Sequence, residues 1–482
     1  MNKIHSLVPL ACILATLVFL TAYSAHAQPS GDQSLPGSFI VMAGSSITED
    51  GSTLVAQNQE SESDGPFYLK KYPRTKHDSG DVTRLSNGLE IPRINITAEW
   101  LSLENKEGFG GSHVLGVNEN QVAVAGRVSL RHDRNKKARE ADPLKSGGAP
   151  EGIITLALQR ARSARECIRI IGDFYNRFGI TTAHGIAISD KKEIWYLETG
   201  GGRHWAAVRI PNDAVWVQAN AYRIGHINPG DVETMASPGL IDFAAQNDLY
   251  DPEEELFNFA RAFGDRTRTI EANKHFNSRR LWRAISILDS TARVVPSQQE
   301  FPQLIRPEEK VSLQKLITVL RDHYENTPYY PLNNDTISEK TIASANTRHT
   351  TIIQLTNGLP ANVGAVMWTG LGSPNTTPYI PFYFGITTVP EPYDKNTPNG
   401  QKAYQTFRSL TDRYYDDPGG YTDTFPGIWK GFQKKLIREQ VKIDQGAMRL
   451  YRSRATMAQH FITVNVEGLS QQALDIAKGH LE

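Results

Sequence analysis

The sequence is poor in cysteine and carries no net charge. Only two cysteines, Cys12 and Cys167, occur in 482 residues, so neither a disulfide scaffold nor a four-cysteine zinc site can form. Lys and Arg total 52 and Asp and Glu total 52, which leaves a net charge of zero. A chain without an overall field of one sign is not expected to bind nucleic acid or an anionic membrane.

Common cofactor and metal motifs are missing from the sequence as well. It contains no HExxH, no P-loop, no GxGxxG and no GxSxG. Five of the histidines lack the spacing of metal ligands and are interpreted as surface or core residues: His113, His132, His184, His204 and His226. We therefore expect neither a bound metal nor a cofactor.

The first 27 residues have the pattern of a secretory signal peptide. Lys3 supplies a positive start, Leu7–Ala22 is a mainly apolar run of 16 residues, and Ala25-His26-Ala27 is a small-x-small cleavage signal. Sixteen apolar residues are short for a membrane span. We expect residues 1–27 to be removed together with Cys12, and the mature protein to be periplasmic or extracellular, with no membrane partner.

The rest of the chain has the composition of a globular protein, with 39% hydrophobic and 22% charged residues. Residues 28–37 are polar and contain Gly and Pro, which is typical of a short spacer or propeptide. Residues 38–482 are expected to form one domain, in which a mostly helical region, 238–325, caps the rest.

Hydrophobic periodicity predicts strands and helices in separate blocks, which indicates an α+β fold rather than an alternating parallel sheet. Strands are predicted at 38–44, 53–58, 67–71, 112–117, 122–130, 184–189, 194–198, 205–210, 215–220, 350–355, 365–369 and 460–466. Helices are predicted at 164–178, 253–263, 278–288, 308–324 and 429–457. Cys167 lies on the apolar stripe of the first helix and is interpreted as a core residue.

Ser38 is a candidate nucleophile. A serine hydroxyl is a weak nucleophile and needs an adjacent base. If the chain is cut before a serine, the freed α-amine has a pKa of about 7.7–8.0 and can serve as that base. Ser38 opens an apolar strand, follows Gly37, and has a disposable spacer upstream.

The same segment resembles the opening of a known family, the N-terminal-nucleophile dipeptidases (dipeptidase A and secernin), which are distant relatives of penicillin V acylase and bile-salt hydrolase. The resemblance lies in residues 38–44 (SFIVMAG) and 50–56 (DGSTLVA). Further similar segments follow in the family's order: 116–119 (GVNE), 193–200 (EIWYLETG), 203–213 (RHWAAVRIPND), 220–224 (NAYRI), 354–368 and 381–385. Counting back from the DGST segment places the nucleophile at Ser38.

This resemblance implies a four-layer αββα sandwich and small peptides as substrates. It implies that Ser38 attacks the peptide carbonyl with its own α-amine as general base and without a metal. By position in its segment, Asn220 would donate to the tetrahedral oxyanion. Glu60 is the candidate for the acidic residue that orients the amine, and both Glu60 and Gln57 are expected at the substrate.

Two departures from the family's pattern affect the expected activity. The nucleophile is Ser38, where the family usually has Cys. The second strand usually reads Arg-Asn-Glu-Asp, and here residues 57–60 read Gln-Asn-Gln-Glu, so a charge that would tune the amine or bind a substrate carboxylate is lost. Alternative functions are an amidase or acylase acting on non-peptide amides, and an inactive family member that serves as a binding protein.

Maturation would require cleavage between Gly37 and Ser38. The Ser38 hydroxyl could itself attack the carbonyl of Gly37 and release residues 28–37. Glycine has no Cβ, which eases the strained approach that this attack needs. The sequence thus predicts autoprocessing.

Overall fold

The computed structural model describes the chain from Ser38 to the C-terminus with several gaps. The described ranges are 38–60, 65–85, 87–105, 115–130, 134–144, 148, 152–180, 182–264, 274–330, 340–417 and 424–482. They belong to a single unit, Pro36–Glu482. The predicted signal peptide and spacer lie outside the described residues, so both stay predictions.

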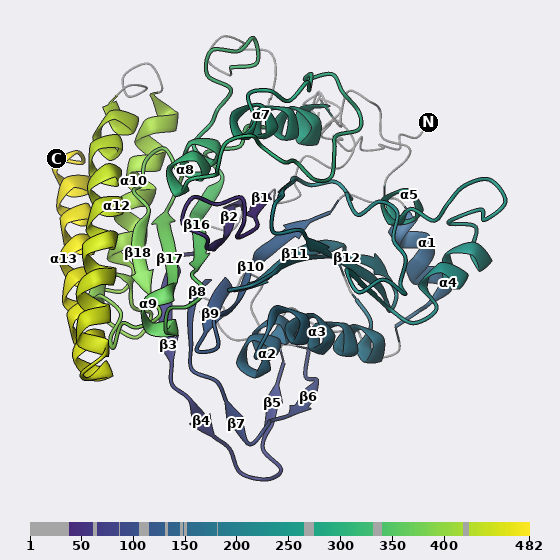
Figure 1. The fold of residues 1–482 in the computed structure, drawn as a ribbon, viewed down its shortest axis with the longest axis horizontal. Helices are drawn as coiled ribbons and strands as arrows, with labels where there is room; N and C mark the ends of the chain where they lie inside the picture. The colour runs from purple at the N-terminus through teal and green to yellow at the C-terminus, as the bar shows by residue number, and fades with distance from the viewer. Residues whose placement is uncertain are drawn as a thin grey trace, which may run out of the picture. The chain divides into compact units, whose positions relative to one another are not determined.

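Within the described ranges, one sheet has six strands, each antiparallel to its neighbours (Figure 1). In spatial order the strands are β14 (Val215–Gln218), β1 (Ser38–Ala43), β2 (Thr53–Glu60), β16 (Thr347–Leu355), β17 (Ala365–Leu371) and β18 (Ile380–Tyr383). Every residue of β1 is buried, which explains its continuous apolar sequence after Ser38. The strands predicted at 38–44 and 53–58 are confirmed, and they pair as a hairpin.

A second sheet has eight strands in the described part of the chain. In order they are β15 (Thr234–Ala236), β13 (His204–Ile210), β12 (Ile194–Gly201), β11 (His184–Asp190), β10 (Val122–Ser129), β9 (Leu115–Asn118), β8 (Trp100–Asn105) and β3 (Phe67–Tyr72). Two short ribbons accompany it, β4 (Thr75–Lys76) with β7 (Ile96–Thr97) and β5 (Val82–Arg84) with β6 (Glu90–Pro92). The sheets face each other, because β1 and β2 contact β10.

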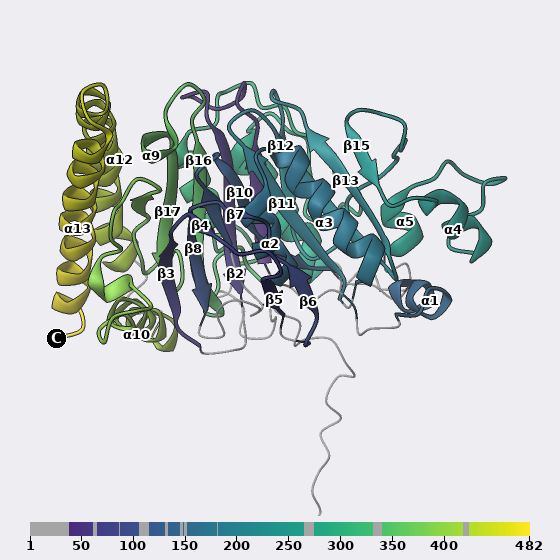
Figure 2. The ribbon, with the colours of Figure 1, turned by 90° about the horizontal axis from the view of Figure 1, so that it is seen from below.

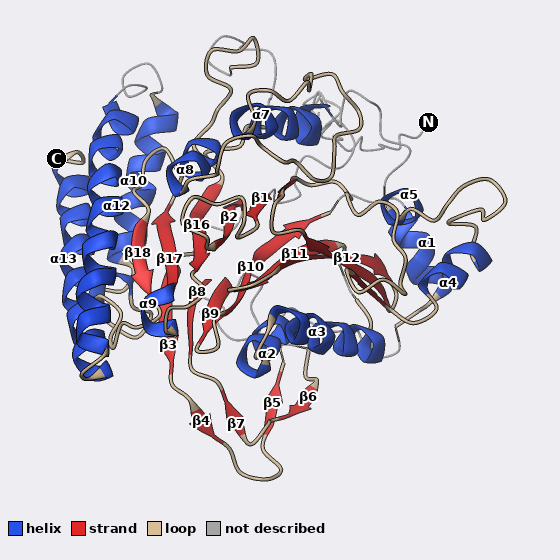
Figure 3. Ribbon diagram, in the orientation of Figure 1, coloured by secondary structure: helices blue, strands red, loops and turns tan. Residues whose placement is uncertain are grey.

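Two helices cover the outer face of the eight-stranded sheet, α2 (Gly152–Arg160) and α3 (Ala164–Phe178) (Figure 3). The hydroxyl of Ser163 accepts from the Glu166 amide and caps the start of α3, and Gly179 ends it. The buried stripe of α3 includes Cys167, so its interpretation as a core residue is confirmed.

In the described part of the chain, five helices cover the other sheet. They are α7 (Arg279–Leu288), α8 (Leu313–Leu320), α10 (Lys402–Asp416), α12 (Thr424–Tyr451) and α13 (Ala455–Gly479). Figure 2 shows α12 and α13 side by side at the edge of the fold, and both helices contact β18. Shorter segments are α1 (Arg134–Ala141), α4 (Leu240–Gln246), α5 (Phe259–Phe263), α9 (Ala361–Gly364), a π-helix (Lys274–Ser278) and a 3-10 turn (Glu391–Tyr393). The layers run helix, sheet, sheet, helix, which confirms the predicted αββα sandwich.

Region 238–325 is less helical than predicted. The helix predicted over 253–263 is wrong for most of its length, since α5 occupies only Phe259–Phe263. The helix predicted over 308–324 is confirmed only at Leu313–Leu320. The helix predicted over 278–288 is confirmed by α7.

The strand predicted at 460–466 is wrong, because these residues lie inside α13. Ile462, Val464 and Val466 favour a strand by propensity. Residues at helical spacing around them are buried against neighbouring elements: Ala458, Ile462, Val466, Leu469 and Ala473. Tertiary packing of that apolar face therefore decides the structure.

None of the helices that the structure describes is both long enough and apolar enough to cross a membrane.

Candidate active site

Ser38 and Asn220 lie at the same end of the six-stranded sheet. Ser38 begins β1 and lies opposite Gln59 of β2, and Ile40 lies opposite Gln218, the last residue of β14. Asn220 follows two residues after the end of β14, the strand that pairs with β1. Residues directly opposed in an antiparallel pair project from the same face of the sheet. Ser38 and Gln59 therefore form a row on one face, and the segment that carries Asn220 continues from the neighbouring strand.

This row faces the second sheet. Gln57 shares the face of Gln59, since side chains alternate along a strand. The side chain of Gln57 occupies the space where a Cβ on Gly126 of β10 would stand, with its Oε1 only 1.7 Å from that position. His349 of β16 lies opposite Gln59 and extends the row. Buried polar side chains between two sheets are unusual in a purely structural core, which makes this row the candidate active site.

The amide of Asn220 is held at both ends. Its Nδ2 donates to the Ser129 carbonyl at 2.8 Å, and its Oδ1 accepts from Arg280 Nη2 at 2.6 Å. A guanidinium can only donate, so this contact fixes which end of the amide is oxygen. An amide nitrogen carries two hydrogens, and the bond to Ser129 uses one of them. Among the described residues, no acceptor is recorded for the second hydrogen.

Arg280 also connects Asn220 to Glu60. Its Nη1 lies 3.9 Å from Glu60 Oε1, while Lys340 Nζ lies 2.8 Å from Glu60 Oε2. Both Arg280 and Glu60 are buried. Burial lowers the pKa of Arg280, and the charge of Glu60 opposes that effect. A buried carboxylate with two cations nearby satisfies the requirement that buried charges be paired.

Gln57 and Gln59 form a second polar pair beside Ser38. Gln57 Nε2 donates to Gln59 Oε1 at 2.6 Å, and both side chains are buried. Gly126 adopts a φ of 95° at an irregularity in the β10 ladder, between Val124 and Arg127. A residue without Cβ at this position leaves room for the Gln57 amide.

Arg280 was not identified from the sequence. It lies in region 238–325, outside every segment that carries the family resemblance, and it meets Asn220 across 60 residues of chain. Its helix α7 has buried residues at helical spacing, and a fully buried arginine among them has no local signature.

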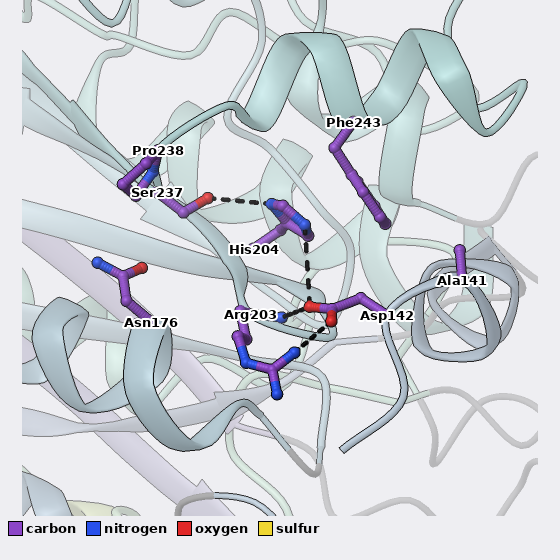
Figure 4. Close-up of a pocket in the computed structure, with 8 residues that line it drawn as sticks. All are labelled: Ala141, Asp142, Asn176, Arg203, His204, Ser237, Pro238 and Phe243. Carbon is purple, nitrogen blue, oxygen red and sulfur yellow. Dashed lines mark hydrogen bonds and ion pairs between the residues drawn. The ribbon is translucent and has the colours of Figure 1, made fainter. Parts of the chain in front are cut away.

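A cavity of about 390 Å³ lies at the start of β13 (Figure 4). It is lined by Ala141, Asp142, Asn176, Arg203, His204, Ser237, Pro238 and Phe243. His204 Nδ1 lies 3.3 Å from Ser237 Oγ and its Nε2 lies 4.0 Å from Asp142 Oδ2, an order that superficially matches a serine triad. The sheet order puts β13 three strands, or roughly 14 Å, from β10 and its Ser129.

The residues of this cavity do not favour Ser237 as a nucleophile. Burial lowers the pKa of His204 to about 4, against the effect of Asp142. So weak a base draws a serine proton poorly near neutral pH. Arg203 also binds Asp142: its guanidinium forms an ion pair with the carboxylate, and its backbone N–H donates a hydrogen bond to Oδ2.

Within the described ranges, no group of three His, Cys, Asp or Glu side chains is arranged to hold a metal ion.

Comparison with known families decides the identity. The profile of Peptidase family C69 matches residues 38–416. The chain belongs to Peptidase family C69. The matched region begins at Ser38 and ends in α10, so the C69 domain includes the row described above, while α12 and α13 lie beyond it.

Several dipeptidases are similar to most of the chain. It is 31% identical to "Probable dipeptidase" of Latilactobacillus sakei over 363 residues, which is 73% of this chain and 75% of the relative. It is 28% identical to "Probable dipeptidase" of Salmonella dublin, over 75% of this chain and 84% of the relative. "Dipeptidase A" of Lactobacillus helveticus is 27% identical, over 73% of this chain and 76% of the relative.

One solved structure, the Caenorhabditis elegans ortholog of N-acylethanolamine-hydrolyzing acid amidase, aligns with 67% of this chain and 94% of its own. The sequence identity is 12% and the TM-score 0.27, which is too low to assign anything to the C69 chain from that neighbour.

Proposed function

We propose that this C69 peptidase is a secreted, metal-independent dipeptidase whose nucleophile is Ser38, with the freed α-amine of Ser38 as general base. The observation that carries the proposal is the polar row between the sheets, with Ser38 at the start of β1 opposite Gln59, and with Asn220 just after the end of the neighbouring strand β14. The start of the family match at residue 38 supports the same nucleophile. The names of the curated relatives support dipeptides as substrates.

In the first step, the Ser38 hydroxyl attacks the carbonyl carbon of the scissile peptide bond. Its proton moves to the α-amine, which becomes an ammonium group. The tetrahedral intermediate then collapses, the ammonium protonates the leaving amine, and an ester to Ser38 remains. Water, deprotonated by the same amine, hydrolyses that ester and regenerates the free hydroxyl.

Asn220 is proposed to stabilise the negative oxygen of each tetrahedral intermediate. Its second amide hydrogen is the donor, and the bonds to Ser129 and Arg280 hold the group in place before the reaction. Such preorganised donors contribute more than donors that must reorient during the reaction.

Glu60 and Gln57 are proposed to act at the substrate, and Glu60 to orient the Ser38 amine, as the family resemblance implies. The contact of Glu60 with Arg280 helps to hold that guanidinium against Asn220. Gln57 replaces the family's usual arginine and supports Gln59, the neighbour of Ser38.

The test compares Ser38→Ala with Ser237→Ala in hydrolysis of a dipeptide panel and an acyl-amide panel, each with and without chelator. Ser237 is the matched control, because it is a buried serine hydrogen-bonded to a histidine. We expect dipeptide hydrolysis that survives the chelator, is lost in Ser38→Ala and is kept in Ser237→Ala. Hydrolysis that is lost with Ser237 instead, or restricted to acyl amides, would contradict the proposal.

A further inference from the structure

Asn220 lies in a short segment, residues 219–224, whose backbone is fixed from both sides. On the near side, Gln218 Nε2 donates to the carbonyls of Ala219 and Ala221, each at 2.7 Å. On the far side, Tyr222 Oη donates to the Thr199 carbonyl at 2.7 Å. The segment follows β14 and is held against the end of β12, in the facing sheet.

A further attachment is made by Glu198 of β12. Its Oε1 accepts the Arg223 backbone N–H at 2.8 Å, and its Oε2 accepts the Ile224 backbone N–H at 3.0 Å. Both bonds satisfy backbone donors that would be costly to leave unpaired in a buried site. Two consecutive amides are thus bound to one carboxylate, three and four residues after Asn220.

The side chain of Glu198 lies on the face of its sheet that is turned toward the six-stranded sheet. It shares a face with Tyr196, two residues earlier in β12, and Tyr196 contacts the ring of Trp216 in β14 at a centroid distance of 5.4 Å. Glu198 therefore projects toward the six-stranded sheet that carries Ser38. The carboxylate is fully buried.

A carboxylate in this position is costly for the fold. Burial raises the pKa of Glu198 to about 8, and the two backbone donors and Arg223 oppose that rise. Two consecutive backbone N–H groups need two acceptor oxygens, and the carboxyl group of Glu198 supplies both. The arrangement therefore holds the backbone of residues 223 and 224 at two points.

We propose that Glu198 is the positioning residue for Asn220, and that it acts by fixing the backbone from which the oxyanion donor projects. This inference rests on the proposed function, because it assigns Asn220 the role given above. Glu198 does not touch the reacting atoms. It determines where the Asn220 amide lies when the tetrahedral intermediate forms.

The test substitution is Glu198→Gln, which keeps the shape but replaces one acceptor oxygen with an NH₂ group. That group faces a backbone N–H, so one of the two bonds to Arg223 and Ile224 is lost. A misplaced oxyanion donor lowers kcat by roughly 10- to 100-fold and leaves KM within about 3-fold.

Glu104→Gln is the matched control. Glu104 is another buried carboxylate of the same sheet, its pKa is also raised by burial, and its described partners are Tyr72 and Lys395. Both variants are compared by thermal unfolding. We expect similar changes in Tm from the two substitutions, with the drop in kcat confined to Glu198→Gln.

The deciding measurement is a double-mutant cycle with Asn220→Ala. If Glu198 acts through Asn220, Glu198→Gln changes kcat by less than about 3-fold once Asn220 is removed. Equal losses of kcat in both backgrounds, or an equal loss in Glu104→Gln, would overturn the inference. A wild type that hydrolyses no dipeptide would overturn the proposed function itself, and the inference with it.

Discussion

Arg280 donates from Nη2 to Asn220 Oδ1 at 2.6 Å while its Nη1 lies 3.9 Å from Glu60, so one buried guanidinium joins two predicted site residues that are 160 positions apart in the sequence. The family's usual arginine is replaced at position 57 by glutamine. Two positively charged side chains nevertheless lie beside Glu60: Arg280 of α7 and Lys340.

Replacing Arg280 with lysine should separate its two contacts. The shorter ammonium side chain keeps a charge for Glu60 but cannot also reach Asn220 with a planar fork of donors. We expect kcat to fall by about 10²-fold, the size of effect seen when a preorganised oxyanion group is disturbed. Arg321→Lys is the control, since Arg321 binds the carbonyls of Pro374 and Thr377. An equal loss of kcat in both variants would contradict a specific role for Arg280.

Replacing Gly126 with alanine should push the Gln57 amide away from Gln59. The added Cβ would lie 1.7 Å from Gln57 Oε1. Gly358→Ala is the control, because Gly358 also has a positive φ, 85°, with nothing within 4 Å of an added Cβ. We expect Gly126→Ala to lower the free energy of unfolding by about 1–3 kcal/mol more than the control, measured by urea unfolding. The excess should shrink in the double variant with Gln57→Ala; an unchanged excess would show that the clash lies elsewhere.

Replacing Ser38 with cysteine should give an active enzyme that a thiol-alkylating reagent inhibits. The family usually carries cysteine at this position, and a thiol performs the same attack. Wild-type hydrolysis should resist the reagent, because Cys167 is buried in α3 and burial raises the pKa of its thiol. Inactivation of the wild type by the reagent would contradict a serine nucleophile.

Acid should destabilise the protein partly through His204. Its pKa is lowered to about 4 in the folded state, so between pH 6.5 and 4 the unfolded chain binds a proton that the folded chain does not. The stability that neutral His204 contributes is complete above the pKa of histidine in the unfolded chain, about 6.5. It is lost as the pH falls toward 4, and the total loss is up to about 3 kcal/mol. Urea unfolding at pH 7 and pH 4.5 should show a smaller acid loss in His204→Gln than in the wild type. Equal losses would contradict the assignment.

Much of the sheet structure was predictable from local pattern. The strands around Ser38, around residues 53–58 and around residues 184–220 were predicted. They were predictable because continuous apolar runs and alternating runs between turn residues both indicate strands. Ser38 was predicted from its place at the start of an apolar strand and from family spacing, and Asn220 from family spacing alone. The pairing of β14 with β1, which brings the segment after β14 to the same end of the sheet as Ser38, is visible only in the structure.

Long-range and context-dependent features were missed for physical reasons. Arg280 reaches Asn220 and Glu60 only after three distant segments meet, so no local spacing reveals it. The strand predicted at 460–466 failed because β-branched residues also fill a helix face when that face is buried. Tertiary contact decided both cases.

The most direct test of the account is intact-mass analysis with N-terminal sequencing of the catalytically active, purified protein. We expect a chain that begins at Ser38, because the hydroxyl gains its base only when the α-amine of the same residue is free. Fully active protein whose chain still begins at Gln28, or at any other residue before Ser38, would contradict it.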